Sequence, residues 1–389
     1  MARLAALTTA AMLAVVCSVT CCQAEGYGYP GPGGGYPSPS PTPPAPTPSG
    51  ADLAVGFYRD ACPNAEAIVR DVVKKAVEQN PGVGAGLIRM LFHDCFVQGC
   101  DASVLLDPTA ANTQPEKLSP PNFPSLRGFE VIDAAKAALE AACPGKVSRA
   151  DIVAFAGRDA SAVLSGGRAD FAMPAGRRDG RASSANDALQ FLPPPSFNLS
   201  ELTASFAAKG LDADDLVIGN NPLLCVRTRM SRPDGLGCVA GTLCVGGPVP
   251  TLVVLSGAHT VGRSHCSSFV GDGRLNASTS DMNPALAASL RRQCPANPTA
   301  ANDPTVVQDT VTPNTLDSQY YRNALRRNVL FTSDAALLRS GQTAAAVVQN
   351  AFVPGLWEQK FAAAMVKMAS IEVKTGANGE IRRNCRVVN

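Results

Sequence analysis

The chain has 389 residues, of which 46% are hydrophobic, so it can bury a sizeable core as one large domain or two closely packed lobes. Its 34 Lys and Arg residues nearly balance 32 Asp and Glu residues and leave a formal charge of +2. This balance provides no long-range field that would favour nucleic acid or an anionic membrane as a partner, so we expect small soluble ligands.

The first 50 residues are predicted to lie outside the folded domain, which then spans residues 51–389. Residues 1–24 contain Arg3, an apolar run and a final Ala24, which is the pattern of a cleavable secretory signal too short to span a bilayer. Residues 25–50 are almost entirely Pro, Gly, Tyr, Ser and Thr, a composition that forms an extended linker. This segment is either a solvated spacer or a tail that associates with wall polymers.

Helical periodicity dominates the rest of the chain, and strand-like alternation is scarce. Ser148 and Asn198 are typical helix N-caps, each followed within three residues by an acidic side chain. The predicted helices span residues 65–79, 84–92, 127–142, 150–165, 198–208, 319–327, 343–350 and 356–371. We therefore expect a mostly α-helical fold with very little β-structure.

Ten of the 13 cysteines lie beyond residue 24, and an oxidising compartment would favour disulfides among them. None of the ten has the Cys-x-x-Cys spacing of a zinc site. Asn198 and Asn276 each begin an Asn-x-Ser acceptor for glycosylation, which also fits a secreted chain.

The first of three histidines, His93, follows Arg89 by four residues, so a helix places the two side chains on one face. A guanidinium beside an imidazole suits chemistry that removes a proton from a bound molecule and stabilises the negative charge left behind. Cleavage of a peroxide requires both steps.

The residues after His93 form an oxygen-rich loop that contains Asp94, Asp101 and Ser103 and that Cys95 and Cys100 could close with a bridge. Two carboxylates, a hydroxyl and turn carbonyls are ligands that Ca²⁺ prefers, although the EF-hand spacing is absent. On these residues alone, a calcium site and a solvated acidic turn both remain open.

The second histidine, His259, follows the apolar run Leu252–Leu255 and is either a satisfied core residue or a ligand. Haem iron takes a proximal histidine whose other ring nitrogen is held by a carboxylate, and Asp334 is a candidate for that carboxylate. The third histidine, His265, is expected to lie at the surface near Cys266.

Three segments taken together strongly resemble the class III secretory plant peroxidases: residues 89–107, 176–180 and 255–262. The resemblance extends over about residues 52–389 with one interruption, and it includes Phe57-Tyr58 near the start and Cys385 near the end. It implies a two-lobed haem peroxidase fold in which one haem b lies between distal and proximal helices.

The resemblance also assigns roles by position. His93 is implied to be the distal acid and base, Arg89 the distal cation, and Phe92 the aromatic wall over the haem. Asn122 would hydrogen-bond His93, whereas His259 would be the iron ligand oriented by Asp334.

Two Ca²⁺ ions are implied, one on each side of the haem. The ligands of the first site would be Asp94, Val97, Gly99, Asp101 and Ser103, and Glu116 would connect this site to the hydrogen-bond network of the distal side. The ligands of the second site would be Thr260, Asp309, Thr312, Thr315 and Asp317. The implied disulfides are Cys62–Cys143, Cys95–Cys100 and Cys266–Cys294.

In function, the resemblance implies a secreted, extracellular or cell-wall enzyme, which we expect to be a monomer. It would reduce hydrogen peroxide and oxidise phenolic donors by one-electron steps, in wall cross-linking, peroxide removal or the response to oxidative stress.

Three departures from the family pattern stand out. Residues 218–253 form an insert that is either a surface loop or an unspliced intron in the gene model. Arg149 replaces the cysteine that would pair with Cys385, so Cys385 is left free or pairs with an insert cysteine, Cys225, Cys238 or Cys244. Arg168 stands where the family commonly has a proline at the donor-binding haem edge. These departures keep open an alternative, a catalytically impaired or haem-free wall-associated protein.

Overall fold

The computed structural model describes residues 53–389 except 212–223, 232–237, 246–249 and 279. The predicted signal and linker, residues 1–50, lie outside the described residues. The side chains of residues 212–249 are not described either, so the pairing of the three insert cysteines lies outside as well.

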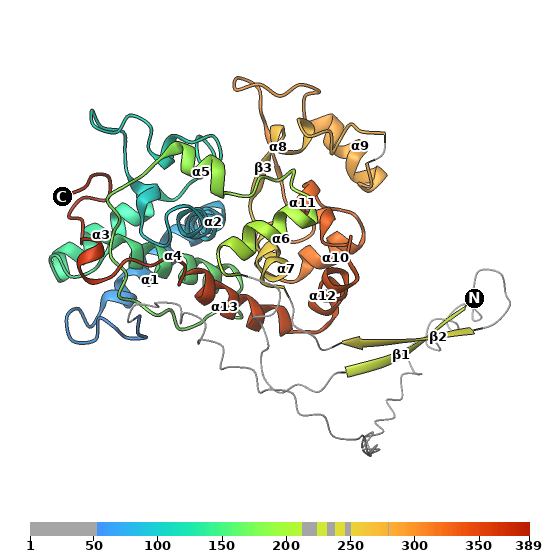
Figure 1. Ribbon diagram of the computed structural model, residues 1–389, viewed down its shortest axis with the longest axis horizontal. Coiled ribbons are helices and arrows are strands. Elements are labelled where there is room, and N and C mark those ends of the chain that lie inside the picture. Colours follow the sequence, from blue (N-terminus) through green and yellow to red (C-terminus); the bar gives the residue numbers. More distant parts are fainter. Residues whose placement is uncertain (1–52, 212–223, 232–237, 246–249, 279) are drawn as a thin grey trace, which may run out of the picture. The chain divides into compact units, whose positions relative to one another are not determined.

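Helices account for most of the described secondary structure (Figure 1). Each predicted helix is present, with ends shifted by a few residues, and the prediction of a mostly α-helical fold is confirmed. The helices are α1 (Ala65–Gln79), α2 (Pro81–Val97), α3 (Phe129–Ala142), α4 (Arg149–Leu164), α5 (Ala185–Phe191), α6 (Leu199–Ala208), α7 (Thr251–Ser256), α8 (Ser267–Val270), α9 (Pro284–Gln293), α10 (Gln319–Leu325), α11 (Thr332–Ala336), α12 (Gly341–Phe352) and α13 (Leu356–Met368). Single 3₁₀ turns are η1 (Ser103–Leu105), η2 (Glu116–Leu118), η3 (Gly257–Thr260) and η4 (Gly376–Asn378).

The four described strands form two small antiparallel pairs. Strand β3 (Arg263–His265) pairs with β4 (Thr305–Val307) just after the second histidine. Strands β1 (Leu224–Ser231) and β2 (Cys238–Val245) pair within the predicted insert, where the sequence indicated a loop without periodicity. The insert therefore contains a regular two-stranded ladder, in place of the loop that we expected.

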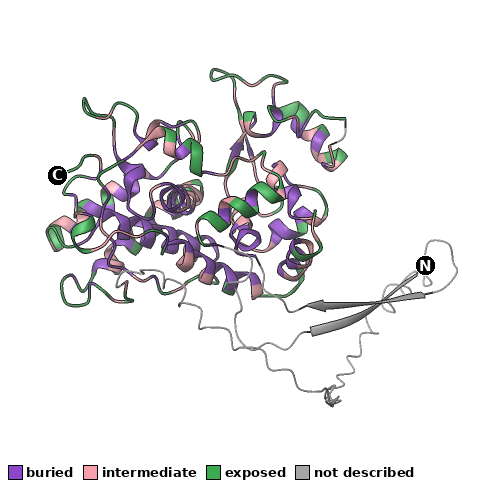
Figure 2. Ribbon diagram, viewed as in Figure 1, coloured by how far each residue is buried: buried purple, intermediate pink, exposed green. Residues whose placement is uncertain are grey.

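The first group of helices packs α1, α2 and α3 around α4. Helix α1 presents Val69, Val73 and Val77, spaced four residues apart, on one buried face. Helix α4 buries nearly every side chain it carries, as a central helix must. Figure 2 shows the buried residues along the inner faces of these helices and the exposed residues on the outer faces. This packing holds α2 rigidly, and α2 carries the first histidine.

The second group packs α7, α10, α12 and α13 together. The only tryptophan, Trp357 on α13, donates its indole N–H to the Val254 carbonyl at 3.1 Å. A Cβ on Gly257 would lie 2.5 Å from the Trp357 indole nitrogen, so only glycine fits where α7 gives way to η3. This close approach fixes the turn that carries His259.

The two groups meet at the turn that follows His259. Gly262, three residues after His259, has a φ of 93°, and a Cβ there would lie 3.1 Å from the Ala85 side chain on α2. Three disulfides join Cys62 to Cys143, Cys95 to Cys100 and Cys266 to Cys294, the pairs that the resemblance implied.

Candidate active site

The distal group is centred on His93, on the buried face of α2. The Arg89 Nε, which can only donate, lies 3.1 Å from His93 Nε2. The Asn122 Oδ1 lies 2.6 Å from His93 Nδ1, and the Asn122 amide nitrogen donates to the Glu116 carbonyl at 2.7 Å. Because the amide oxygen must then accept, Nδ1 carries the proton, and the lone pair of Nε2 accepts from Arg89 Nε. The geometry therefore makes Nε2 a base.

Burial reinforces this state. Burial and, second, the neighbouring Arg89 cation lower the pKa of His93 to about 3, despite the opposing hydrogen bond to Asn122. Arg89 is held in turn by the Pro121 carbonyl at 2.7 Å and the Ser125 hydroxyl at 3.0 Å. Neither of these two partners was identified from the sequence, because both lie more than 30 residues away with no motif around them.

Phe92, next to His93, is partly buried and stacks against Phe96 with ring centroids 4.2 Å apart. Phe206 on α6 packs against both rings, with centroids at 6.3 and 5.0 Å. An apolar aromatic wall thus borders the imidazole, as expected beside a flat hydrophobic ligand.

The proximal group is centred on His259 in η3. The Asp334 Oδ1 on α11 lies 2.8 Å from His259 Nδ1, and the Tyr320 hydroxyl donates to the same oxygen at 2.7 Å. Asp334 is 2% exposed, whereas the His259 side chain is 39% exposed. The carboxylate keeps the proton on Nδ1, so Nε2 is available to an iron ion, which is the arrangement that a histidine ligand of haem needs. Tyr320 is a further contributor that the sequence analysis missed.

The distal loop fits a hard cation. Within the described residues, Asp94 Oδ1, Ser103 Oγ and both carboxylate oxygens of Glu116 are buried without a hydrogen-bond partner. Burial and the neighbouring Asp101 carboxylate raise the pKa of Asp94 to about 8, and burial with Asp94 and Asp101 raises the pKa of Glu116 well above its usual range. A calcium ion would compensate for this concentration of negative charge.

Gly99 shows how closely the loop is packed. Its φ is 86°, and a Cβ there would lie 2.5 Å from the Glu372 carbonyl. The Val97 carbonyl, another implied ligand, accepts from Lys209 Nζ at 3.3 Å. Hence the carbonyls expected to bind the ion lie in a fixed turn that other segments enclose.

A second oxygen-rich cluster lies directly after the proximal histidine. The Thr260 hydroxyl lies 3.3 Å from Asp309 Oδ2 and 3.1 Å from Asp317 Oδ1, and the Thr312 hydroxyl lies within 3.4 Å of the same two oxygens. The Thr315 backbone N–H is bonded to the Thr312 carbonyl at 3.0 Å. The residues of the second implied calcium site are thus brought together.

In the described part of the chain, no group of three or more His, Cys, Asp or Glu side chains could hold a metal ion together. Each implied donor set has two carboxylates and is completed by hydroxyl and carbonyl oxygens, which are ordinary calcium ligands. His265 is only partly exposed and its Nδ1 lies 2.9 Å from the Asp303 carbonyl, so it takes no part in either group.

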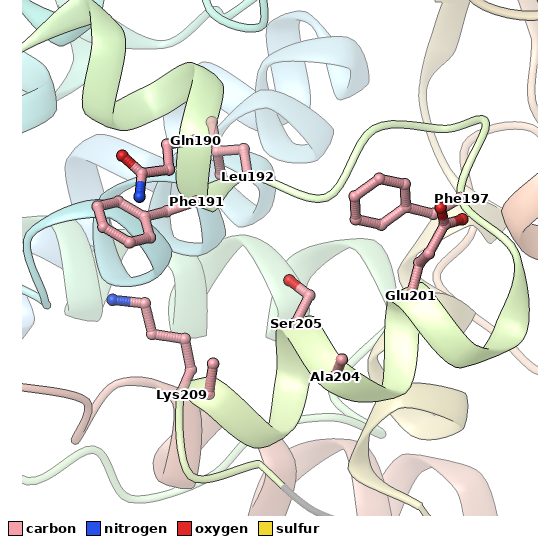
Figure 3. A pocket seen from close by; sticks show the side chains of 9 residues that line it. Gln190, Phe191, Leu192, Phe197, Glu201, Ala204, Ser205 and Lys209 are labelled. Carbon is pink, nitrogen blue, oxygen red and sulfur yellow. The ribbon is translucent and has the colours of Figure 1, made fainter.

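A separate cavity of about 330 Å³ lies between α5 and α6 (Figure 3). Phe191, Phe197 and Lys209 line it, with the Lys209 ammonium 5.0 Å from the centre of the Phe191 ring. Neither His93 nor His259 borders this cavity, so it is distinct from the two histidine groups.

Comparison with known proteins identifies the family. The family model described as peroxidase matches residues 69–219 and 249–352. The chain belongs to the peroxidase family. It is 58% identical over 337 residues to "Peroxidase 2" of Zea mays, an alignment that covers 87% of this chain and 89% of the relative. It is 48% identical to "Peroxidase 5" of Vitis vinifera (87% and 92% covered) and 42% identical to "Peroxidase 39" of Arabidopsis thaliana (88% and 94% covered).

The resemblance to the class III plant peroxidases is thus confirmed, and the chain is a haem peroxidase that acts on hydrogen peroxide. The break in the family match falls between residues 219 and 249, inside the interval of 218–253 expected for the insert. Thr251, Leu252 and Val253 belong to helix α7 and are buried, so they are part of the domain core.

Proposed function

We propose that this peroxidase is a secreted enzyme in which His93 and Arg89 activate hydrogen peroxide and His259 holds the iron of a single haem b. The observation that carries the proposal is the protonation state of His93: Asn122 holds the proton on Nδ1, and Nε2 faces the Arg89 cation as a base. When bound, the haem supplies the redox chemistry, namely cleavage of the peroxide bond and one-electron oxidation of donors.

The protein's own residues would move the protons. His93 Nε2 takes the proton from the peroxide oxygen and returns it to the departing oxygen, which leaves as water. Arg89 stabilises the negative charge that develops on that oxygen. Its position is fixed, because one terminal nitrogen of the guanidinium donates to both the Pro121 carbonyl and the Ser125 hydroxyl, while Nε contacts the imidazole. The low pKa of His93, about 3, keeps the base unprotonated at neutral pH.

Two calcium ions are proposed to brace the two sides. Asp94, Asp101 and Ser103 would hold one ion beside the helix of His93, and Asp309 and Asp317 would hold the other beside Thr260. Because Thr260 directly follows His259, the second ion would fix the iron ligand in place.

The donors are proposed to be small phenols, and the enzyme is proposed to act as a monomer in the cell wall. Residues 1–24 would be removed as a signal, and residues 25–50 would tether the domain to wall polymers. The exposed Asn198 and Asn276 would accept glycans. In the described part of the chain, no helix is long and apolar enough to cross a membrane. The impaired alternative has no support in the site, because the distal and proximal side chains are both assembled.

His93→Ala tests the proposal, with His265→Ala as the matched control. We expect His93→Ala to keep its haem but to reduce peroxide at least about 10²-fold more slowly, because it loses the general base. The third histidine should be dispensable. Stopped-flow measurement of peroxide consumption at equal haem content gives both rates, and equal rates for the two variants would refute the assigned role.

A further inference from the structure

Lys374 contacts the distal loop from the segment that follows α13. Its ammonium donates to the Gln98 carbonyl at 2.9 Å and forms an ion pair with Asp101 Oδ2. The Lys374 side chain is 27% exposed, whereas Asp101 is 1% exposed. A flexible cation therefore reaches inward to a buried carboxylate that is also a proposed calcium ligand.

Asp101 cannot turn away from this contact. Its Oδ1 accepts from the Ser103 N–H at 2.9 Å, and its own carbonyl accepts from the Gly180 N–H at 2.8 Å. A Cβ on Gly180 would lie 2.1 Å from Asp101 Oδ2, so the carboxylate is pressed against the backbone. Because the carboxylate is fixed, a calcium ion and the ammonium must both be accommodated by the same group.

The negative charges around the loop are why competition between calcium and the ammonium for Asp101 should affect calcium affinity. Asp94 and Glu116 carry buried oxygens that have no partner among the described residues, and both side chains feel the charge of Asp101. Asp187 adds a further negative charge near Glu116. The Arg382 cation partly compensates the charge of Asp94. Lys374 supplies a positive charge directly at Asp101, and it is attached by four methylene groups to a partly exposed backbone segment, so it can yield to a divalent ion.

We propose that Lys374 is a tethered cation that competes with calcium for Asp101: it supports the distal loop when no metal is bound, and it lowers the affinity of the loop for calcium. This inference rests on the distal calcium site proposed above. Lys374 is thus a residue that sets metal affinity without belonging to the donor set, and it would allow calcium to leave without collapse of the carboxylate cluster.

Lys374→Met and Lys374→Arg form the test pair, because methionine keeps much of the side-chain volume without charge and arginine keeps the charge. Calcium titration calorimetry on the full, haem-loaded chain should show Lys374→Met binding one of its calcium ions about tenfold more tightly than the wild type, as expected on removal of one repelling charge from a partly solvated site. Lys374→Arg should bind calcium with the wild-type affinity.

Thermal unfolding gives a second readout that a merely structural lysine would not produce. In EGTA, Lys374→Met should melt below the wild type, because Asp101 loses its counter-charge. In excess calcium, the difference should shrink or reverse, because tighter binding stabilises the folded state.

Asp94→Asn separates failure of the inference from failure of the calcium site. If Asp94→Asn removes one calcium ion but Lys374→Met binds calcium no more tightly than the wild type, the competition is refuted and the site stands. If Asp94→Asn leaves calcium stoichiometry and affinity unchanged, the distal site itself is wrong, and the inference is overturned with it.

Discussion

Arg149→Cys should restore a disulfide to Cys385 and stabilise the fold. The Arg149 side chain is completely buried, and its three guanidinium nitrogens have no hydrogen-bond partner among the described residues. The nearest carboxylate, Asp179 at 3.7 Å, is shared with Arg382 at the same distance. Cys385 is a buried free thiol that interacts with Arg149, and burial raises the pKa of this thiol to about 11. The thiol is therefore neutral and cannot compensate for the guanidinium.

The size of the effect follows from two terms. A bridge between positions 149 and 385 would close a loop of 236 residues (385 − 149), for which chain entropy predicts about 5 kcal/mol, and existing bridges lower this to about 2–4 kcal/mol. Removal of a buried guanidinium that has no hydrogen bond and shares one distant carboxylate, Asp179, adds on the order of 1–3 kcal/mol. We expect a total gain of about 3–7 kcal/mol in the free energy of unfolding.

Guanidinium chloride unfolding of the non-reduced proteins measures this gain, and intact mass measures bridge formation through the loss of two hydrogens. The double variant Arg149→Cys/Cys385→Ser separates the two terms, because it removes the guanidinium but cannot form the bridge. If the thiols at positions 149 and 385 stay free in Arg149→Cys, or if the double variant is as stable as Arg149→Cys, the gain in stability does not come from a restored disulfide.

Four further outcomes follow from the two histidine groups and the calcium loop. Asn122→Ala should slow peroxide reduction about 10- to 100-fold, because His93 loses the acceptor that fixes its tautomer; an unchanged stopped-flow rate would show that Asn122 has no such role. Asp334→Asn should raise the iron reduction potential, because His259 loses the carboxylate that makes its imidazole a stronger electron donor. A redox titration that gives the wild-type potential would contradict this. Burial lowers the pKa of His93 to about 3, so the rate of peroxide reduction, measured directly after a pH jump, should stay nearly constant from pH 8 to about pH 4 and fall only below that. A fall centred near pH 6.5 would mean that His93 has the pKa of a solvent-exposed histidine. In EGTA, the folded state binds a proton on Asp94 more readily than the unfolded chain does, because the pKa of Asp94 in the folded state is raised to about 8. The melting temperature should therefore fall as the pH rises from about 4 to 8, and calcium should remove this dependence. A melting temperature in EGTA that does not change with pH would contradict the prediction.

The helices and the family were predictable from the sequence because their signals are local. The apolar spacing of Val69, Val73 and Val77 defined α1 to the residue, and the N-cap Ser148 marked the start of α4. Short helices such as α8 and α11 were missed, because four or five residues show too few turns for a periodic pattern. The strands of the insert were missed for a related reason: the first alternates only over the six residues 226–231, and the second contains almost no polar residues.

The site residues that stand in sequence motifs were predictable, whereas those that reach the site only through tertiary contacts were not. His93, Arg89 and His259 stand in motifs that the family shares, so the sequence was enough to name them. Ser125 and Tyr320 join the two groups only through tertiary contacts from distant segments. Lys374 is separated from Asp101 by 273 residues, and no pattern in the sequence indicates their contact.

Haem binding to His259 is the most direct test of the proposed active site. The full chain should bind one haem and give a Soret band that shifts on addition of hydrogen peroxide. His259→Ala should lose the spectrum of an iron held by imidazole, and added free imidazole should restore it. A His259→Ala protein with an unchanged Soret band and an unchanged response to peroxide would contradict the proposed arrangement.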